Sequence, residues 1–377
     1  MSRTKVLLVG AAGETGGSIA NGLLEQPNFE VHALVRPRSA QKPAIVALQE
    51  RGVQIRKGDL KGPEESLADV LTGIDVVISC VGPSEQQDQI PLAKAAKNAG
   101  VQRFVPCGFI TVAPPGGIMW LRDEVCWLAH PNLTFSINPS TQKETVYNHI
   151  KQLRLPYTII DVGWWYQFSY PRLESGRIDY AMTSANNEIV ADGNSPIALT
   201  DLRDIGRYVA KIITDDRTLN KMVLAYNEVK TQNEIYDLLE EISEEKIQRN
   251  YIPEETIYTR VLAARQSSET YPFDPIKFIP RYLAEYQLSW GLRGDNTPEY
   301  AKYLGYVTSK ELYPDFTPTD FREYLETVVR GAAKGVYTDR TISKAQQRFF
   351  PRSESSDSLY TRIFPRTESS DSLYMSR

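Results

Sequence analysis

The sequence predicts an α/β fold built on a doubly wound parallel β-sheet, with a smaller, partly interleaved second domain. Short runs rich in β-branched residues alternate with stretches whose apolar residues recur at helical spacing. Strands that alternate with helices form a parallel sheet with crossover helices. At 377 residues and 41% hydrophobic content, the chain can also bury a substantial core. The expected strands are residues 5–9, 31–35, 53–57, 76–80, 104–105 and 158–162.

Helices are expected between these strands, because the intervening apolar residues repeat every three to four positions. Together, these strands and helices predict a first domain over residues 1–162. The expected helices are residues 17–24, 43–51, 64–71 and 91–99.

The pattern changes near Gly163 to aromatic-rich loops and less regular elements. We expect residues 163–335 to form the substrate-side domain, partly interleaved with the first. Its expected elements are a strand at 187–191, a helix at 201–214, an apolar strand at 221–226 and a helix at 232–242.

The last segment, residues 336–377, contains a tandem repeat. The run from Phe350 to Tyr360 recurs almost unchanged from Phe364 to Tyr374. Two Ser-rich, polar copies cannot bury enough apolar surface to fold alone. We therefore expect a disordered tail, dispensable for folding and cofactor binding from about Ser343 onward, with a phosphorylatable peptide motif as the alternative.

Composition excludes several classes of function. There are 43 lysines and arginines against 47 acids, a net charge of −4, which offers no basic surface for nucleic acid. No signal-type start and no membrane-length apolar run are present, so we expect a cytoplasmic protein. The cysteines and histidines lack metal-ligand spacing, and no metal is expected. These residues are Cys80, Cys107, Cys126, His32, His130 and His149.

A glycine-rich turn follows the first strand. Gly10, Gly13 and Gly16 stand between that strand and a helix, where a dinucleotide pyrophosphate meets the helix N-terminus. Gly10 permits the tight turn, Gly13 a close approach to the phosphates, and Gly16 close packing of the helix on the sheet. The spacing predicts a Rossmann-type dinucleotide site, and Thr15 is expected among its contacts.

The end of the second strand indicates which dinucleotide binds. It reads Leu34-Val35-Arg36-Pro37-Arg38, where an NAD-selective protein carries an acid for the ribose 2′-hydroxyl. An arginine suits a 2′-phosphate through bidentate, charge-assisted hydrogen bonds. The expected cofactor is NADP(H), and the alternative is that Arg36 is only a solvated charge.

Two further segments follow strands at the same predicted edge of the sheet. Asp59 follows the third strand, and Cys80 and Gly82 follow the fourth. Ligands bind at the carboxyl ends of strands in such folds, so these residues are expected contacts on the adenine and nicotinamide sides. Cys80 has no basic neighbour in sequence and is interpreted as a small buried residue, not a nucleophile.

Several motifs resemble those of the isoflavone-reductase-like and NmrA-like families of atypical short-chain dehydrogenases. They are the glycine turn, Leu34-Val35-Arg36-Pro37, Gly100-Val101-Gln102-Arg103-Phe104-Val105-Pro106 and Leu155-Pro156-Tyr157-Thr158. The resemblance continues to Tyr313-Pro314-Asp315-Phe316 and covers nearly everything except residues 125–142 and the tail. It implies an NADPH-dependent oxidoreductase.

The resemblance also implies a catalytic residue. In the reductases a lysine precedes the Leu-Pro-Tyr-Thr strand on a helix, and Lys143 matches it, thirteen residues before Pro156. This position implies that Lys143 faces the nicotinamide and acts as general acid or base. A solvated lysine on a helix surface is the structural alternative.

A rival pair lies on the same expected helix. Tyr147 and Lys151 match the Tyr-x-x-x-Lys pattern of ordinary short-chain dehydrogenases, and the spacing places both on one helix face. The pattern is short and common by chance. The position of the lysine in the resembling reductases favours Lys143 over this pair as the catalytic residue.

The substrate pocket is expected to differ from that of the plant reductases. Pro106-Cys107-Gly108-Phe109 stands where those enzymes carry Pro-Ser-Glu-Phe. Trp164, Trp165 and Tyr166 follow the last core strand and are expected to wall a planar substrate. Packing between the two domains is their alternative role.

Residues 125–142 interrupt an otherwise continuous helical lead-in of the family type. The insert begins with Val125, whose codons start with GT, and ends with Gln142, for which CAG is one codon. These are the letters of intron borders. The insert is therefore either translated intron sequence or a loop at the pocket mouth.

Two functions remain open from sequence. The first is a reductase that acts on a small aromatic or conjugated metabolite, as in secondary metabolism, with Lys143 handling the proton. The second is a non-catalytic NADP(H)-binding redox sensor that regulates a protein partner. Lys143 favours the enzyme, since a sensor needs no proton donor.

Overall fold

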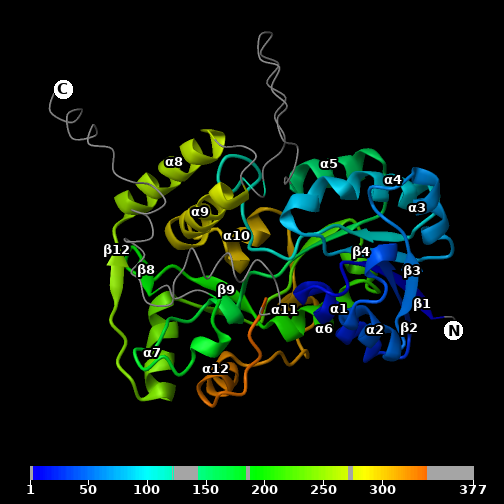
Figure 1. Cartoon of the computed structure of the whole chain (residues 1–377). Helices are drawn as coiled ribbons and strands as arrows, with labels where there is room; N and C mark the ends of the chain where they lie inside the picture. Colours follow the sequence, from blue (N-terminus) through cyan, green and yellow to red (C-terminus); the bar gives the residue numbers. More distant parts are fainter. Residues whose placement is uncertain (1–2, 121, 123–142, 184–186, 271–274, 338–377) are drawn as a thin grey trace, which may run out of the picture.

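The computed structural model describes residues 3–120, 122, 143–183, 187–270 and 275–337. Figure 1 shows two lobes, with the N-terminal half (blue to cyan) at the right and most of the second half (green to orange) at the left. Strands and helices alternate in the N-terminal lobe, as the sequence predicts. Its elements are β1 (Thr4–Val9), α1 (Glu14–Leu24), β2 (Phe29–Val35), α2 (Pro43–Glu50), β3 (Gln54–Lys57), α3 (Glu64–Leu71), β4 (Val76–Ser79), α4 (Gln89–Asn98), β5 (Arg103–Val105), α5 (Lys143–Gln152) and β6 (Thr158–Asp161).

The central sheet has the order β3-β2-β1-β4-β5, and all its strands are parallel. A bridge between Phe104 and Tyr157 joins β6 to its edge, and β10 (Lys221–Leu224) and β13 (Val307–Thr308) continue it in parallel. The direction of winding reverses between β1 and β4. Such a switch point opens a crevice at the carboxyl ends of the strands, where ligands bind.

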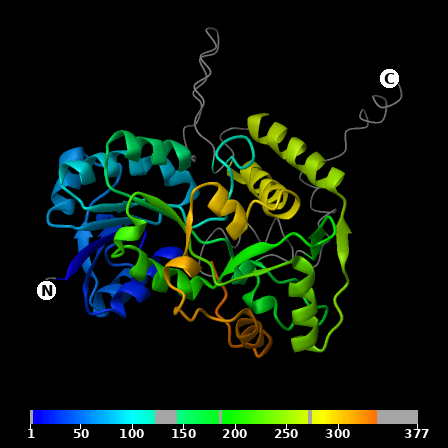
Figure 2. The ribbon, with the colours of Figure 1, turned by 180° about the vertical axis from the view of Figure 1, so that it is seen from behind.

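The sheet is buried on both faces, which confirms the doubly wound arrangement. Val6 and Leu8 of β1 pack toward α1, α2 and α6 (Leu202–Ile212), while Leu7 and Val9 pack toward α3, α4 and α5. Successive strand residues point to opposite faces, so one strand supplies both cores. Figures 1 and 2 show the two helical layers with the sheet between them.

The second lobe has a hydrophobic core of its own, formed by Leu199, Ile235, Leu239, Trp290 and Phe321 among others. Its strands are short, and helices make up most of it. Its elements are β7 (Trp164–Trp165), β8 (Glu188–Val190), β9 (Ile197–Thr200), β11 (Glu228–Lys230), α7 (Gln232–Ser243), β12 (Asn250–Ile252), α8 (Glu254–Thr270), α9 (Pro275–Tyr286), a π-helical turn (Gln287–Leu292), α10 (Pro298–Tyr303), α11 (Ser309–Leu312) and α12 (Phe321–Val329).

The two lobes are interleaved, as predicted. The interleaving is more extensive than a single domain boundary at residue 162 would allow. The strands β10 and β13 complete the first sheet, and α6 packs on its face against α1. The helices α8 and α9 lie in a region where the sequence showed only mixed aromatic and charged residues. Pro280 lies inside α9, which obscures its helical pattern.

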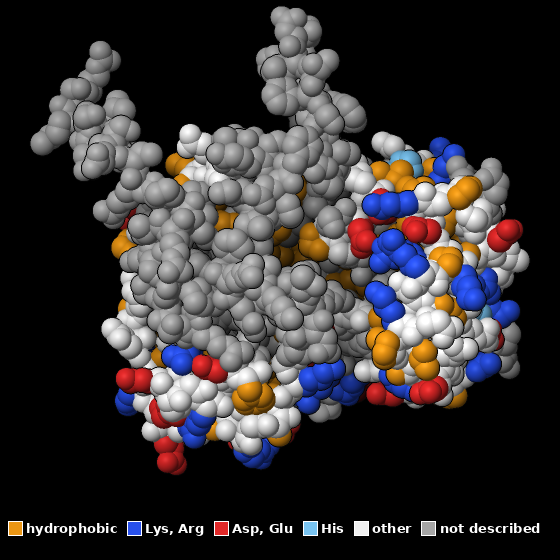
Figure 3. All heavy atoms as spheres, viewed as in Figure 1, with side chains coloured by type: hydrophobic (Ala, Val, Ile, Leu, Met, Phe, Trp, Pro, Cys, Tyr) orange, Lys and Arg blue, Asp and Glu red, His pale blue; other side chains and the backbone are white. Residues whose placement is uncertain are grey.

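The surface of the N-terminal lobe and the end of the described chain are the remaining features of the fold. Figure 3 shows positive and negative side chains interspersed on the N-terminal lobe. Val336 is buried and Tyr337 packs against the hydrophobic core, so the first two residues of the predicted segment 336–377 belong to the folded body. The insert 125–142 and the repeats lie outside the described residues. Among the described helices, none is long and apolar enough to cross a bilayer.

Candidate active site

The glycine turn has the geometry that a dinucleotide requires. Gly10 follows β1 with a φ of +82°, and a Cβ there would collide with the carbonyl of Cys80. A Cβ on Gly16 would collide with the carbonyl of Gly10. The Gly13 N–H donates to that same carbonyl at 2.9 Å, and α1 begins at the next residue. The turn therefore leaves the N-terminus of α1 open to a phosphate.

The polar residues predicted for the adenine side lie at neighbouring strand ends. Arg36 follows β2, its side chain is 46% exposed, and its Nη1 lies 3.9 Å from Oε1 of Glu85. Asp59 follows β3 and accepts a hydrogen bond from the Lys61 N–H at 3.1 Å. Because β1 separates β2 from β4, the Arg36–Glu85 pair spans the end of β1. The Arg36 guanidinium is thus exposed at the carboxyl edge of the sheet, near the glycine turn that follows β1.

A pocket of about 240 Å³ lies at the carboxyl edge of the sheet. Segments from both lobes line it, so it exists only where the lobes meet. It joins predicted cofactor contacts to predicted substrate contacts. The lining residues are Thr15, Cys80, Val81, Pro83, Gln86, Cys107, Gly108, Phe109, Ile110, Thr111, Lys143, Gly163, Trp164, Trp165, Phe168, Tyr286 and Tyr337.

Lys143 is the first residue of α5, and its side chain is directed inward. It is 3% exposed, which excludes the solvated-surface alternative. Its Nζ donates to the carbonyls of Cys107 at 2.5 Å and Gly108 at 3.1 Å, and lies 3.6 Å from Cys107 Sγ. A buried ammonium needs such acceptors, because losing its water is otherwise very costly. The two carbonyls hold Nζ at the pocket wall.

The rival pair is not brought together at this site. Tyr147 is 1% exposed in the core beneath α5, and burial raises the pKa of its phenol well above the ordinary value. Lys151 is exposed to solvent. Neither residue lines the pocket, so the helix directs Lys143 to the site and Tyr147 away from it.

A buried ionic cluster that the sequence analysis missed lies next to α5. Arg122 donates to Glu144 at 2.8 Å, to Asp161 at 2.8 Å and to the Tyr306 hydroxyl at 2.7 Å. The Tyr306 hydroxyl in turn donates to Asp161 at 2.6 Å. Buried charges are retained when they are paired and hydrogen-bonded in this way. Since Glu144 follows Lys143, the cluster fixes the start of α5.

The aromatic residues predicted for the substrate divide into two groups. Trp164 and Trp165 line the pocket, together with Phe168, Tyr286 and Tyr337, which the sequence analysis did not identify. No sequence signal distinguishes these three from core aromatics. Trp165 and Phe168 stack with ring centroids 5.4 Å apart.

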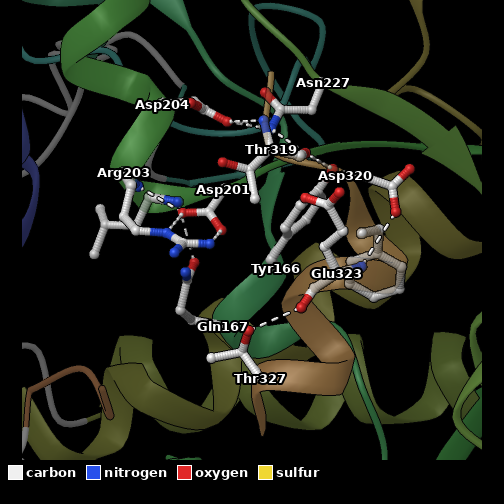
Figure 4. Close-up of polar contacts among 12 residues, drawn as sticks. Tyr166, Gln167, Asp201, Arg203, Asp204, Asn227, Thr319, Asp320, Glu323 and Thr327 are labelled. Atoms are coloured by element: carbon white, nitrogen blue, oxygen red, sulfur yellow. Dashed lines mark hydrogen bonds and ion pairs between the residues drawn. The ribbon is translucent and has the colours of Figure 1, made fainter. Parts of the chain in front are cut away.

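Tyr166 does not lie where the sequence predicted, in the wall of the substrate pocket. It is fully buried, packs against Phe321 and Tyr324, and does not line the pocket. Its hydroxyl lies 2.8 Å from a carboxylate oxygen of Glu228. Figure 4 shows it among the polar contacts of Asp201, Asp204, Asn227 and Thr319, where the start of α6 meets the second lobe. Tyr166 is the first residue of the 3-10 turn Tyr166–Phe168, where the chain leaves β7 and the Tyr166 side chain enters this core.

Cys80 lines the pocket but is not poised as a nucleophile. Burial raises the pKa of its thiol well above the ordinary value, although Lys143 opposes the shift. Gly82 precedes the 3-10 turn Pro83–Asp88 and donates its N–H to Glu85 at 3.4 Å. Within the described residues, no cluster of His, Cys, Asp and Glu could hold a metal ion.

Comparison with known proteins identifies the group to which this fold and site belong. The family model described as the NmrA-like family matches residues 2–124 and 136–325. The chain belongs to the NmrA-like family. The break in the match, residues 125–135, falls inside the insert predicted at 125–142.

Two relatives of this NmrA-like protein indicate its enzyme class. Asnovolin J 5′,6′-dehydrogenase of Aspergillus novofumigatus is 46% identical over 330 residues, 86% of this chain and 95% of the relative. An isoflavone reductase-like protein of Olea europaea is 29% identical over 337 residues, 87% of this chain and 99% of the relative. The NmrA-like chain is therefore an oxidoreductase, which favours the enzyme over the redox sensor.

Solved structures support the same fold for this NmrA-like protein. Isoflavone reductase is 24% identical with a TM-score of 0.67, covering 86% of this chain and 99% of its own. Leucoanthocyanidin reductase of Vitis vinifera, solved with NADPH, is 22% identical with the same TM-score and the same coverage. The predicted Rossmann-type architecture is confirmed, and the predicted cofactor agrees with this neighbour.

Proposed function

We propose that this NmrA-like oxidoreductase transfers hydride between NADP(H) and a small, uncharged, aromatic or conjugated metabolite, with Lys143 as general acid or base. The observation that carries the proposal is the placement of Lys143. Its Nζ lies in the wall of a pocket whose lining also includes the predicted cofactor contacts Thr15 and Cys80 and the aromatic pair Trp164 and Trp165.

The cofactor site fits a dinucleotide with a 2′-phosphate. Collisions exclude side chains at Gly10 and Gly16, so the backbone can approach the pyrophosphate. Arg36 supplies the donors for the 2′-phosphate. When bound, NADPH supplies the hydride for reduction, and NADP⁺ accepts one for oxidation.

In the proposed reaction, Lys143 donates or accepts the proton that accompanies hydride transfer. Reduction of a conjugated carbonyl compound adds a hydride and a proton, and oxidation removes both. Two acceptors, the carbonyls of Cys107 and Gly108, fix the position of Nζ, so the ammonium is held ready instead of sampling many rotamers. In reduction, Nζ gives a proton to the atom that gains negative charge, and in oxidation it takes one back.

The pocket walls define the substrate class. Among the described lining residues, Lys143 is the only charged side chain, and aromatic rings form much of the remaining wall. Such a site suits a largely apolar, planar molecule with one polar group near Nζ. The dehydrogenase relative acts on asnovolin J, which makes this compound and its chemical class natural candidates.

A substrate panel tests the proposal. Purified protein is mixed with NADPH or NADP⁺ and with conjugated enones, aromatic metabolites or asnovolin J, and NADPH absorbance is followed. We expect turnover of at least one uncharged conjugated compound, faster with NADP(H) than with NAD(H). Turnover restricted to charged acids or sugars, or no turnover by a protein that binds NADPH normally, would contradict the proposed substrate class.

A further inference from the structure

Tyr337 forms part of the pocket wall, although it lies after α12, the last helix of the described residues. Its ring is nearly parallel to those of Trp165 and Phe168, with centroids 6.4 Å and 6.2 Å away and interplanar angles of 16° and 9°. It is half-buried, unlike the fully buried tyrosines of the core. The ring therefore extends the aromatic wall to the solvent side.

The backbone of Tyr337 is fixed in an unusual conformation. Its φ is +57°, in the left-handed region that side chains other than those of Gly, Asn and Asp rarely adopt. Such residues persist when their surroundings determine the conformation. Val336 is buried on one side, and the Tyr337 N–H donates to Oε1 of Glu14 at 2.9 Å.

Glu14 connects this conformation to the cofactor turn. It is the first residue of α1 and directly follows Gly13. Tyr337 therefore contacts the glycine turn through its backbone and the aromatic wall through its ring. No other residue of the described chain end, 330–337, lines the pocket.

We propose that Tyr337 is a specificity-determining residue whose ring closes the outer side of the substrate pocket and stacks on a planar substrate. This inference rests on the proposed function for the identity of the ligand. Glu14 is a positioning residue in this arrangement, because it holds the Tyr337 backbone while the ring makes the contact.

Access to the pocket thiols tests the closing role without any substrate. Cys80 and Cys107 line the pocket, so labelling by N-ethylmaleimide, followed at each cysteine by peptide mass spectrometry, reports how open it is. Tyr337→Gly removes the ring and tolerates the left-handed backbone. We expect severalfold faster labelling of both cysteines in Tyr337→Gly, and labelling near the wild-type rate in Tyr337→Phe.

A matched control removes backbone strain elsewhere. Glu244 is exposed, has a φ of +58° and ends α7 far from the pocket lining. Glu244→Gly makes the same kind of backbone change without opening the pocket. Unchanged labelling in Tyr337→Gly, or equal acceleration in Glu244→Gly, would overturn the closing role.

Binding of 2-naphthol to the protein saturated with NADP⁺ tests the stacking role by calorimetry. We expect Tyr337→Gly to weaken this binding about three- to tenfold, the effect of one aromatic contact, and Tyr337→Phe to retain it. NADPH affinity should stay unchanged in both variants. No binding by wild type, or an equal loss of NADPH affinity, overturns the stacking role. If 2-naphthol binds as expected but the substrate panel shows no turnover, the proposed function is wrong, whereas the stacking role of Tyr337 in the pocket wall is retained.

Discussion

Two backbone carbonyls fix the position of Lys143, the proposed general acid or base. Lys143 is held by Cys107 and Gly108, whose chain segment follows β5. A Cβ on Gly108 would collide with the carbonyl of Ile160, so only glycine lets this segment lie so close to β6. Gly108, which stands where the plant sequence Pro-Ser-Glu-Phe has a glutamate, thus shapes the pocket wall by allowing this close approach.

Lys143→Ala should lower kcat by about 10²–10⁴, the usual contribution of a positioned proton-transfer group. NADPH affinity should be nearly unchanged, because the proposed mechanism places the lysine at the reacting atoms and not at the phosphates. Lys143→Arg should not restore turnover, since a guanidinium keeps its proton near neutral pH. Steady-state kinetics and NADPH titration measure both quantities.

Tyr147→Phe is the control for this prediction. The Tyr147 hydroxyl is buried away from the pocket and has no hydrogen-bond partner within the described part of the chain. Its loss should leave turnover close to wild type. Loss of turnover in Tyr147→Phe, with activity retained in Lys143→Ala, would restore the ordinary Tyr-x-x-x-Lys mechanism.

Arg36→Ala should weaken NADPH binding at least about tenfold and spare NADH. A charge-assisted contact to phosphate contributes on the order of 1.5–3 kcal/mol, and NADH lacks the 2′-phosphate. Titration calorimetry with both cofactors measures the difference.

Arg51→Ala serves as the matched control for Arg36. Arg51 is also exposed, but it lies between α2 and β3, where β3 enters the sheet, at the opposite edge from the glycine turn. It should leave both affinities unchanged. Equal losses for NADPH and NADH in Arg36→Ala would show that this arginine does not bind the 2′-phosphate.

At the level of elements, the contact between α1 and α6 supports the cofactor turn. The Ser18 hydroxyl donates to the Leu202 carbonyl at 2.6 Å and accepts from the Gly206 N–H at 3.0 Å. A Cβ on Gly22 would collide with the backbone of Gly206. The two helices can approach this closely only because glycines face each other.

Gly22→Ala should destabilise the protein by about 1–3 kcal/mol, since overpacking forces the helices apart. Gly17→Ala is the control on the same helix, because its Cβ would meet only the Ala11 carbonyl at 3.8 Å. That substitution should be neutral or stabilising by up to about 1 kcal/mol through helix propensity. Denaturant unfolding without cofactor compares the two, and equal effects would contradict the packing argument.

At the level of the whole molecule, the chain crosses between lobes several times. After β6 it builds β7 in the second lobe, returns for α6 and β10, and returns again for β13. The pocket lies where these crossings meet, so its walls come from both lobes. The sequence predicted a partly interleaved second domain but not these particular crossings, because a local pattern does not show such returns.

Removal of residues 338–377 should leave the Tm and NADPH affinity unchanged, because the repeats offer almost no apolar surface to a core. A cut after Gly335 also removes Val336, whose side chain is 5% exposed. Losing a buried valine should cost about 1.5–3 kcal/mol and lower the Tm measurably. Scanning calorimetry of both truncations distinguishes them.

Equal Tm values for the two truncations would contradict a structural role for Val336. A fall in Tm after removal of residues 338–377 alone would show that the repeats contribute to folding. The segment that the sequence predicts to be dispensable, from about Ser343 onward, lies entirely within residues 338–377.

The sequence by itself determined the alternating elements, the glycine turn and the family, and it predicts Arg36 as the partner of the 2′-phosphate, because each of these depends on neighbouring residues. The tertiary structure decided the pocket. Tyr286 and Tyr337 reach it from elements more than a hundred residues after Lys143, and common aromatic residues carry no local mark of such a meeting. Arg122 and Asp161 pair for the same reason, since distant charges find each other only when the fold buries them together.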